Sequence, residues 1–268
     1  MGSEMSSRDR TLAAISHQEA DRVPVMFRQM APLSHLWKDE FERADVLLGM
    51  GVDDRLTLFM ERGPHPDVEI RDWYDDDSDP RYRLVGREWR TPKGTLRAVM
   101  RRTDDHTYDS GVPLASDHNP PRGVEMPFKG REDLPKLAYL LHEPTRDEIA
   151  RFREQASVKK RFAKDRGVFL VGDPGPGGDF TFWVCGSNIY YLANDDPECL
   201  AELLDLVYAC ELKWTEIILE AGVDAIDTRS FYELAPMWSP RFFDEYFAPR
   251  LEKKARLAHQ SGAKMMCG

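Results

Sequence analysis

The 268-residue sequence lacks a long apolar run, and it also lacks a signal peptide and paired cysteines. Its longest apolar stretches, residues 167–172 and 217–226, are far shorter than the roughly 20 residues that a membrane span needs. The N-terminus is polar, and the four cysteines show no CxxC spacing. We therefore expect no membrane partner, free thiols and a cytoplasmic location.

A basic run that could follow a phosphate backbone is also missing. The chain has 37 basic and 47 acidic residues, which give a formal net charge of −10, so we expect no nucleic-acid partner. What the sequence does contain is 41% hydrophobic residues, enough to bury the core of one domain over residues 1–268.

Short, β-rich apolar runs alternate with segments of helical periodicity along most of the chain. The runs predict strands at residues 22–27, 56–60, 168–172, 223–227 and 263–267. The periodic segments predict helices at residues 7–18, 33–50, 132–141, 145–166, 198–221 and 239–260. Strand, helix and strand in this alternation favour parallel βαβ units, and hence an α/β fold.

Residues 61–126 interrupt the alternation and are rich in Asp, Arg, Pro and Gly. We interpret them as an insertion. Within it, residues 82–90 and 95–102 flank a Pro/Gly turn at residues 91–94, which predicts a β-hairpin.

A glycine-rich loop at residues 174–178 directly follows the strand at 168–172. Because glycine has no side chain, such a loop lets a large flat ligand or a phosphate approach the backbone. The loop lacks the GK[ST] ending of a P-loop, so the sequence does not favour a nucleotide.

Several segments resemble the uroporphyrinogen decarboxylase (URO-D) superfamily. Residues 8–25 resemble its opening helix and DRVPV-type first strand, and residues 24–29 resemble its P-V-x-x-x-R-Q sequence. Residues 238–249 and 259–268 resemble the helix and fifth strand that its decarboxylases share with corrinoid-linked methyltransferases. The resemblance runs from about Arg8 to Gly268, with the insertion least covered.

The resemblance implies a TIM-type (β/α)8 barrel, of which this chain would hold about five of the eight units. An open sheet of five strands leaves two edges unpaired. We therefore expect a C-terminally truncated chain, a split protein completed by another chain, or a homodimer that covers the gap.

Arg28 and Gln29 are candidate substrate-binding residues. A guanidinium at the carboxyl end of a barrel strand presents a rigid fork to a carboxylate, and the resemblance implies that Arg28 does so for a propionate group. Two alternatives stay open. Arg28 can be a surface ion-pair partner, and Gln29 can serve only to satisfy backbone groups.

The strand at 223–227 leads into a second candidate group of residues. Asp227, Tyr232 and Glu233 are candidates for acid–base catalysis, and Arg229 is a candidate for substrate binding. An ion pair of Arg229 with Asp227 or with Glu233 that only fixes the loop is an equally good interpretation.

The corrinoid-linked methyltransferases bind zinc through a His-x-Cys-Gly motif after strand five. Here Met265 stands in place of the histidine, which leaves Cys267 as the one candidate metal ligand in the motif. The alternative is that Cys267 is a small buried hydrophobic residue. His106, Asp117 and His118 of the insertion fit no zinc template, and we expect them to be solvated loop residues.

Departures from the decarboxylases favour the methyltransferase branch. Residues 30–32 replace a second arginine of their first loop, and residues 56–62 contain no counterpart of their substrate-binding aspartate. The sequence therefore predicts methyl transfer to or from a corrinoid carried by a partner protein. The alternatives are uroporphyrinogen III decarboxylation and a non-enzymatic module that binds a tetrapyrrole or another small molecule.

Overall fold

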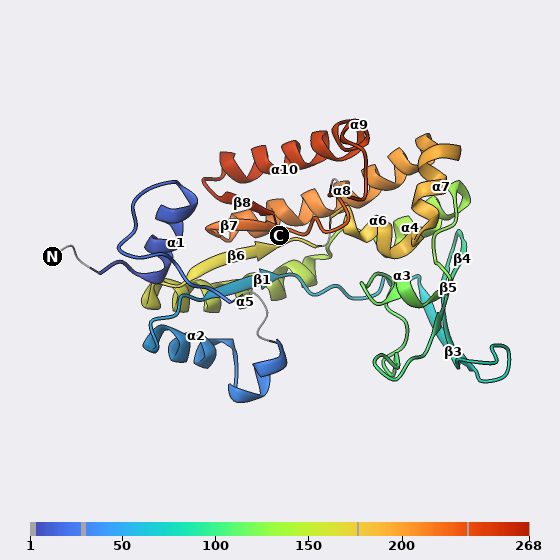
Figure 1. Cartoon of the computed structure of the whole chain (residues 1–268), viewed down its shortest axis with the longest axis horizontal. Coiled ribbons are helices and arrows are strands. Elements are labelled where there is room, and N and C mark those ends of the chain that lie inside the picture. The colour runs from blue at the N-terminus through green and yellow to red at the C-terminus, as the bar shows by residue number, and fades with distance from the viewer. Residues whose placement is uncertain (1–3, 28–30, 176, 235, 268) are drawn as a thin grey trace.

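The computed structural model describes residues 4–27, 31–175, 177–234 and 236–267, whose strands form two sheets (Figure 1). One sheet is parallel, with strand order β1-β6-β7-β8. The other is antiparallel, with strand order β2-β3-β4-β5. The strands are β1 (Arg55–Phe59), β2 (Glu69–Asp75), β3 (Leu84–Thr91), β4 (Gly94–Arg101), β5 (Gly123–Glu125), β6 (Phe169–Asp173), β7 (Ala225–Thr228) and β8 (Lys264–Cys267).

Helices precede and link the parallel strands, and none within the described ranges is long and apolar enough to cross a membrane. A capping box between Thr145 and Glu148 begins the long helix α5, and the Asp196 side chain caps α8. The helices are α1 (Ser7–Ile15), η1 (Ala31–Leu36), α2 (Glu40–Gly49), α3 (Asn119–Arg122), η2 (Arg131–Asp133), α4 (Leu134–Leu140), α5 (Arg146–Arg166), α6 (Asp179–Cys185), α7 (Asn188–Asp195), α8 (Pro197–Glu220), α9 (Pro240–Phe242), the π-helical turn η3 (Phe243–Phe247) and α10 (Ala248–Gln260).

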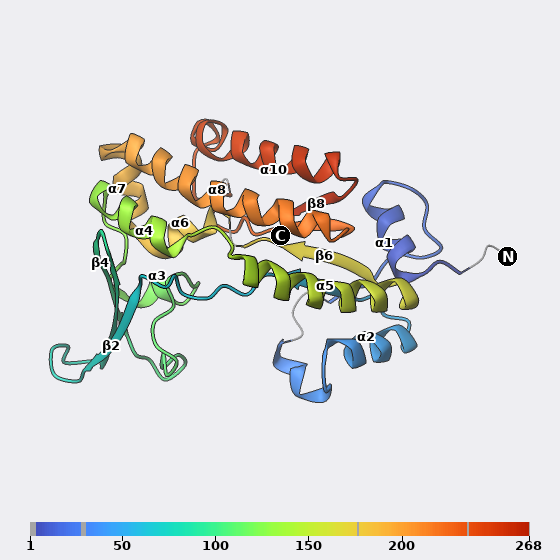
Figure 2. The same ribbon diagram turned by 180° about the vertical axis from the view of Figure 1, so that it is seen from behind.

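Side chains of the parallel strands alternate between two faces of the sheet. Leu170 and Ile226 face the larger core, together with residues of α2, α5, α8 and α10. Figure 2 shows α5, α8 and α10 in front of the sheet. Phe169 and Ala225 face the other way into a smaller core that α1 covers. The helices between successive parallel strands therefore share one side of the sheet.

The alternation of strands and helices in the sequence correctly predicted an α/β chain with a parallel sheet. The sheet is open among the described residues, which do not close it into a barrel. Strand order follows chain order, since β1, β6, β7 and β8 lie beside one another in the sequence in which they occur.

The strand predicted at residues 22–27 is wrong as a full strand. Only an isolated parallel bridge joins Met26 to Asp53, beside the start of β1. Two features limit the pairing. Pro24 has no N–H to donate, and the Val25 N–H donates to the Asp53 side chain at 2.9 Å instead of to a backbone carbonyl.

The segment predicted as a hairpin forms the centre of the antiparallel sheet. β3 and β4 pair from Leu84 with Arg101 to Thr91 with Gly94. The edge strands β2 and β5 were not predicted. Most β2 side chains are exposed, so this strand lacks the alternation of apolar and polar residues that marks a half-buried strand.

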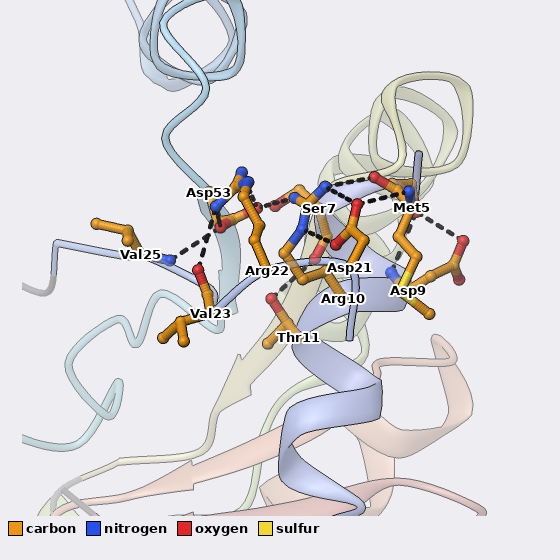
Figure 3. Close-up of polar contacts among 11 residues, drawn as sticks. Met5, Ser7, Asp9, Arg10, Thr11, Asp21, Arg22, Val23, Val25 and Asp53 are labelled. Carbon is orange, nitrogen blue, oxygen red and sulfur yellow. Dashed lines mark hydrogen bonds and ion pairs between the residues drawn. The ribbon is translucent and has the colours of Figure 1, made fainter. Parts of the chain in front are cut away.

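A network of buried charges fixes the N-terminal segment to the parallel sheet (Figure 3). The Asp53 side chain is fully buried and accepts hydrogen bonds from Arg10 at 2.5 Å and from Arg22 at 2.8 Å. Arg10 also donates to Asp21 at 2.6 Å and to the Met5 carbonyl at 2.6 Å. Burial raises the pKa of Asp53, but the Val25 N–H and the two guanidinium groups outweigh it and hold the pKa below its usual value.

We expect Asp53→Asn to lower the free energy of unfolding by about 3–5 kcal/mol, because it leaves the Arg10 guanidinium buried without its closest counter-charge. Urea denaturation followed by circular dichroism measures the change. The control is Asp45→Asn, which removes an exposed pair with Arg166 at 3.1 Å and should cost at most about 1 kcal/mol. Equal losses in the two variants would show that Asp53 has no special structural role.

Candidate functional site

A pocket of about 500 Å³ lies where three parallel strands end. Open parallel sheets and barrels place their ligands at this edge, because loops from several strands converge there. Its wall comes from β1 and the residues after it, the end of β6, the loop after β7, two helices and the connection between β4 and β5. The lining residues are Phe59, Met60, Arg62, Ala115, Asp173, Gly175, Phe180, Trp183, Trp214 and Arg229.

Two arginines give the pocket its charge. The guanidinium of Arg62 lies over the indole of Trp214, 3.4 Å from the ring centroid. Arg229 pairs with Asp173 at 3.4 Å and remains 47% exposed. The charges of Arg62, Arg229 and Asp173 sum to +1. Aromatic side chains, among them that of Phe180, line the same pocket. The pocket can therefore accept an anionic group attached to an apolar or flat body.

A phenol and a carboxylate meet beside the pocket wall. The Tyr232 hydroxyl and the Trp183 indole N–H both donate to Asp117 Oδ1 at 2.8 Å. The Tyr232 ring stacks on Phe182 with centroids 4.1 Å apart. Desolvation and the hydrogen bond to Asp117 raise the pKa of Tyr232 to about 12, so the phenol keeps its proton at neutral pH.

Asp179 ties the loop after β7 to helix α6. Its fully buried carboxylate accepts backbone N–H bonds from Tyr232 at 2.8 Å and from Phe231 at 3.3 Å. Burial raises the pKa of Asp179 to about 6 although both N–H groups favour the ionised form. Asp179 therefore fixes the backbone of the loop after β7, which contains Tyr232 and Glu233.

Glu233 lies beneath the glycine-rich loop and is 2% exposed. Its Oε1 atom accepts from the Gly178 N–H at 2.7 Å and from the Tyr208 hydroxyl at 2.8 Å. Next to it, Lys254 of α10 donates to Glu211 of α8 at 2.6 Å and also to the Thr228 hydroxyl. Helices α8 and α10 thus carry a buried polar layer under the loop.

The residues predicted from the β7 end of the sequence do not form one constellation. Asp227 pairs with Arg55 of β1 at 3.4 Å, while Arg229 pairs with Asp173. The predicted ion pairs Asp227–Arg229 and Arg229–Glu233 are therefore wrong. Asp227 and Thr228 are consecutive strand residues and face opposite sides of the sheet, so only Thr228 joins the layer around Lys254.

Arg28 and Gln29, the other predicted binding residues, lie outside the described residues. Cys267, at the end of β8, is an exposed free thiol. Desolvation raises the pKa of its thiol, and the nearby Lys254 ammonium opposes the shift.

The donors around Cys267 do not fit the zinc implied by the resemblance. Met265 supplies a thioether and Lys254 a positive charge, and neither favours a divalent cation. Within the described part of the chain, no group of three or more His, Cys, Asp or Glu side chains could hold a metal ion. We derive no chemistry through zinc.

The sequence analysis did not predict several residues of the site. Glu211 follows buried Val207 by four residues, and Lys254 precedes buried Ala258 by four, so each charge falls on the apolar stripe of its helix. A charge on such a stripe signals a buried partner. Arg62 and Asp117 lie in the irregular insertion and give no comparable signal.

The chain is similar to known proteins in structure only. No protein-family model matches the chain, and no curated protein matches it. Among solved structures, a methyltransferase from Methanosarcina mazei is similar, with 16% sequence identity and a TM-score of 0.49. The alignment covers 98% of this chain and 69% of that chain. A similarity of this size does not assign an activity.

We expect Gly178→Ala to lower the free energy of unfolding by about 1–3 kcal/mol, because the added methyl group would lie 2.1 Å from Glu233 Oε1. The φ of Gly178 is −63°, so alanine fits its backbone and the effect is steric. Gly49→Ala is the control, since its methyl group would meet nothing within 4 Å in α2 and should not destabilise the protein. A stable Gly178→Ala protein would contradict the tight contact between loop and Glu233.

Proposed function

We propose that the chain forms the substrate-binding part of a TIM-type barrel enzyme. Two features support the barrel. The parallel strands follow chain order, and helices α5, α8 and α10 pack into one core on one side of the sheet. A doubly wound sheet places its helices on both faces, whereas a barrel places them all outside.

The ligand that we propose for the pocket is a small carboxylate with a flat or apolar body. This proposal rests on one observation. Two arginines, Arg62 and Arg229, lie in a pocket with aromatic walls at the carboxyl ends of the strands. Because the Arg62 guanidinium already packs on the Trp214 ring, it needs little reorganisation when a carboxylate binds. Arg229 forms an ion pair with Asp173, and the carboxylate of a ligand would compete with Asp173 for this arginine.

The reaction that we propose is methyl transfer to or from a corrinoid carried by a partner protein. It is supported by the resemblance of residues 238–249 and 259–268 to the helix and fifth strand of the superfamily, and by the departures of residues 30–32 and 56–62 from the decarboxylases. The chain's own contribution is to bind the acceptor or donor and to exclude water around it. The Tyr232 hydroxyl gives its one proton to Asp117, so its oxygen can accept a hydrogen bond from that molecule.

Binding of benzoate should exceed binding of benzamide by about tenfold or more, since the two probes share a shape and differ in charge. Quenching of tryptophan fluorescence measures both, because Trp183 and Trp214 line the pocket. Arg62→Gln and Arg229→Gln should each weaken benzoate binding about tenfold and leave benzamide unchanged. The control is Arg153→Gln, whose exposed arginine pairs with Glu220 away from the pocket. Equal affinity for the two probes would refute an anion-binding pocket.

Methyl transfer is tested by mixing the chain with a methylated corrinoid protein and a thiol acceptor. We expect the visible spectrum to change to that of the demethylated corrinoid, and Arg229→Gln to slow the change about tenfold. An unchanged spectrum rejects methyl transfer. Release of carbon dioxide from a porphyrinogen would then favour the decarboxylase, and tight tetrapyrrole binding without turnover would favour a binding module.

A further inference from the structure

Three charged side chains are buried together beneath the glycine-rich loop. Glu211 is 3% exposed, Glu233 is 2% exposed and Lys254 is fully buried. With both carboxyl groups ionised, these three residues would have a net charge of −1. A buried net charge is strongly destabilising unless a partner neutralises it.

Each of the two carboxyl groups has one oxygen with a partner and one without. Glu233 Oε1 accepts two hydrogen bonds, and Glu211 Oε1 accepts one from Lys254. The Oε2 atoms of Glu211 and Glu233 are buried and have no hydrogen-bond partner among the described residues. Two buried oxygens without donors destabilise the fold unless each gains a hydrogen-bond partner.

Both carboxyl groups lie against adjacent residues of the loop. A methyl group on Gly177 would be 3.5 Å from each oxygen of Glu211, and one on Gly178 would be 2.1 Å from Glu233 Oε1. The two carboxyl groups therefore lie beneath consecutive residues of the loop, and that of Glu233 occupies the space that a side chain at Gly178 would need.

We infer that Glu211 and Glu233 share a single proton, held between their two unpartnered oxygens beneath the glycine-rich loop. The proton removes the excess negative charge and gives both oxygens a hydrogen bond at once: a neutral Glu233 donates through Oε2, and an ionised Glu211 accepts. The inference does not depend on which molecule the pocket binds.

The surroundings determine which residue carries the proton. The Lys254 ammonium donates directly to Glu211 at 2.6 Å, so a negative charge is best stabilised on Glu211. Burial, with the negative charges of Asp179 and Glu211, raises the pKa of Glu233 to about 8, in spite of the Tyr208 and Gly178 donors. The titratable and charged groups around the pair are Arg62 after β1, Asp179 of α6, Tyr208 of α8, Lys254 of α10 and Cys267 of β8.

The shared proton makes stability depend on pH in a defined direction. The folded chain holds this proton up to about pH 8, whereas an unfolded glutamate releases it near its ordinary value of 4.5. The folded state therefore binds one proton more within this window, and the contribution to stability falls as pH rises through it. The folding equilibrium constant should lose about tenfold per pH unit from this source and level off above pH 8.

Urea denaturation at a series of pH values tests this with Glu233→Gln and Glu211→Gln. Glutamine at 233 imitates the protonated acid, so the tenfold loss per pH unit should disappear relative to the wild type. Glutamine at 211 leaves Glu233 to pair with Lys254, and the same loss should disappear. The double variant should be less stable than the two single losses together imply, because Lys254 then has no counter-charge. A wild-type slope that persists in both single variants would overturn the inference.

Infrared spectroscopy of the wild-type protein gives a readout that needs no variant. We expect the carbonyl band of a protonated carboxylic acid near neutral pH, and its loss above pH 8. Absence of the band below pH 8 would overturn the inference. So would a stability that depends on whether sodium, potassium or choline is the cation at constant ionic strength, because a metal cation would then occupy the place of the proton.

Discussion

Neutralising buried carboxylates is the constraint on which both ends of the parallel sheet depend. At the amino ends of the strands, Asp53 is fully buried and two guanidinium groups surround it. At the carboxyl ends, Glu211 and Glu233 face one ammonium group, that of Lys254. The first end has cations in sufficient number and serves as an anchor. The second is short of positive charge, and such imbalance is typical of sites where protons are held or moved.

The sequence predicted the parallel part of the fold well because apolar runs and helical periodicity record burial directly. It did not predict β2, whose side chains are mostly exposed, or the reduction of residues 22–27 to one bridge, which follows from Pro24 and the Asp53 side chain. The candidate site was predicted in part. Tyr232, Glu233 and Arg229 do lie near the strand ends, but the partners of their side chains lie 25 to 115 residues away in the sequence. Spacing along a chain does not reveal such pairings.

Strand order and helix placement bring the candidate site to the carboxyl ends of the parallel strands. Three strands end at one pocket, and the loops that follow them supply its charged groups. The buried layer of α8 and α10 lies under the glycine-rich loop, and Glu233 leaves no room for a side chain at Gly178. Rigid helices thus position the loop, while the arginines above it stay partly exposed and available to a ligand.

The antiparallel sheet is joined to the site by the connection between β4 and β5, through Ala115 in the wall and Asp117 beside Tyr232. This part of the chain contributes no strand to the parallel sheet. Its length and sequence are thus free to vary while the strand ends stay fixed. Exchange of this one segment between related chains would change which ligands fit the pocket without rebuilding the scaffold, which makes it a natural module for altering specificity.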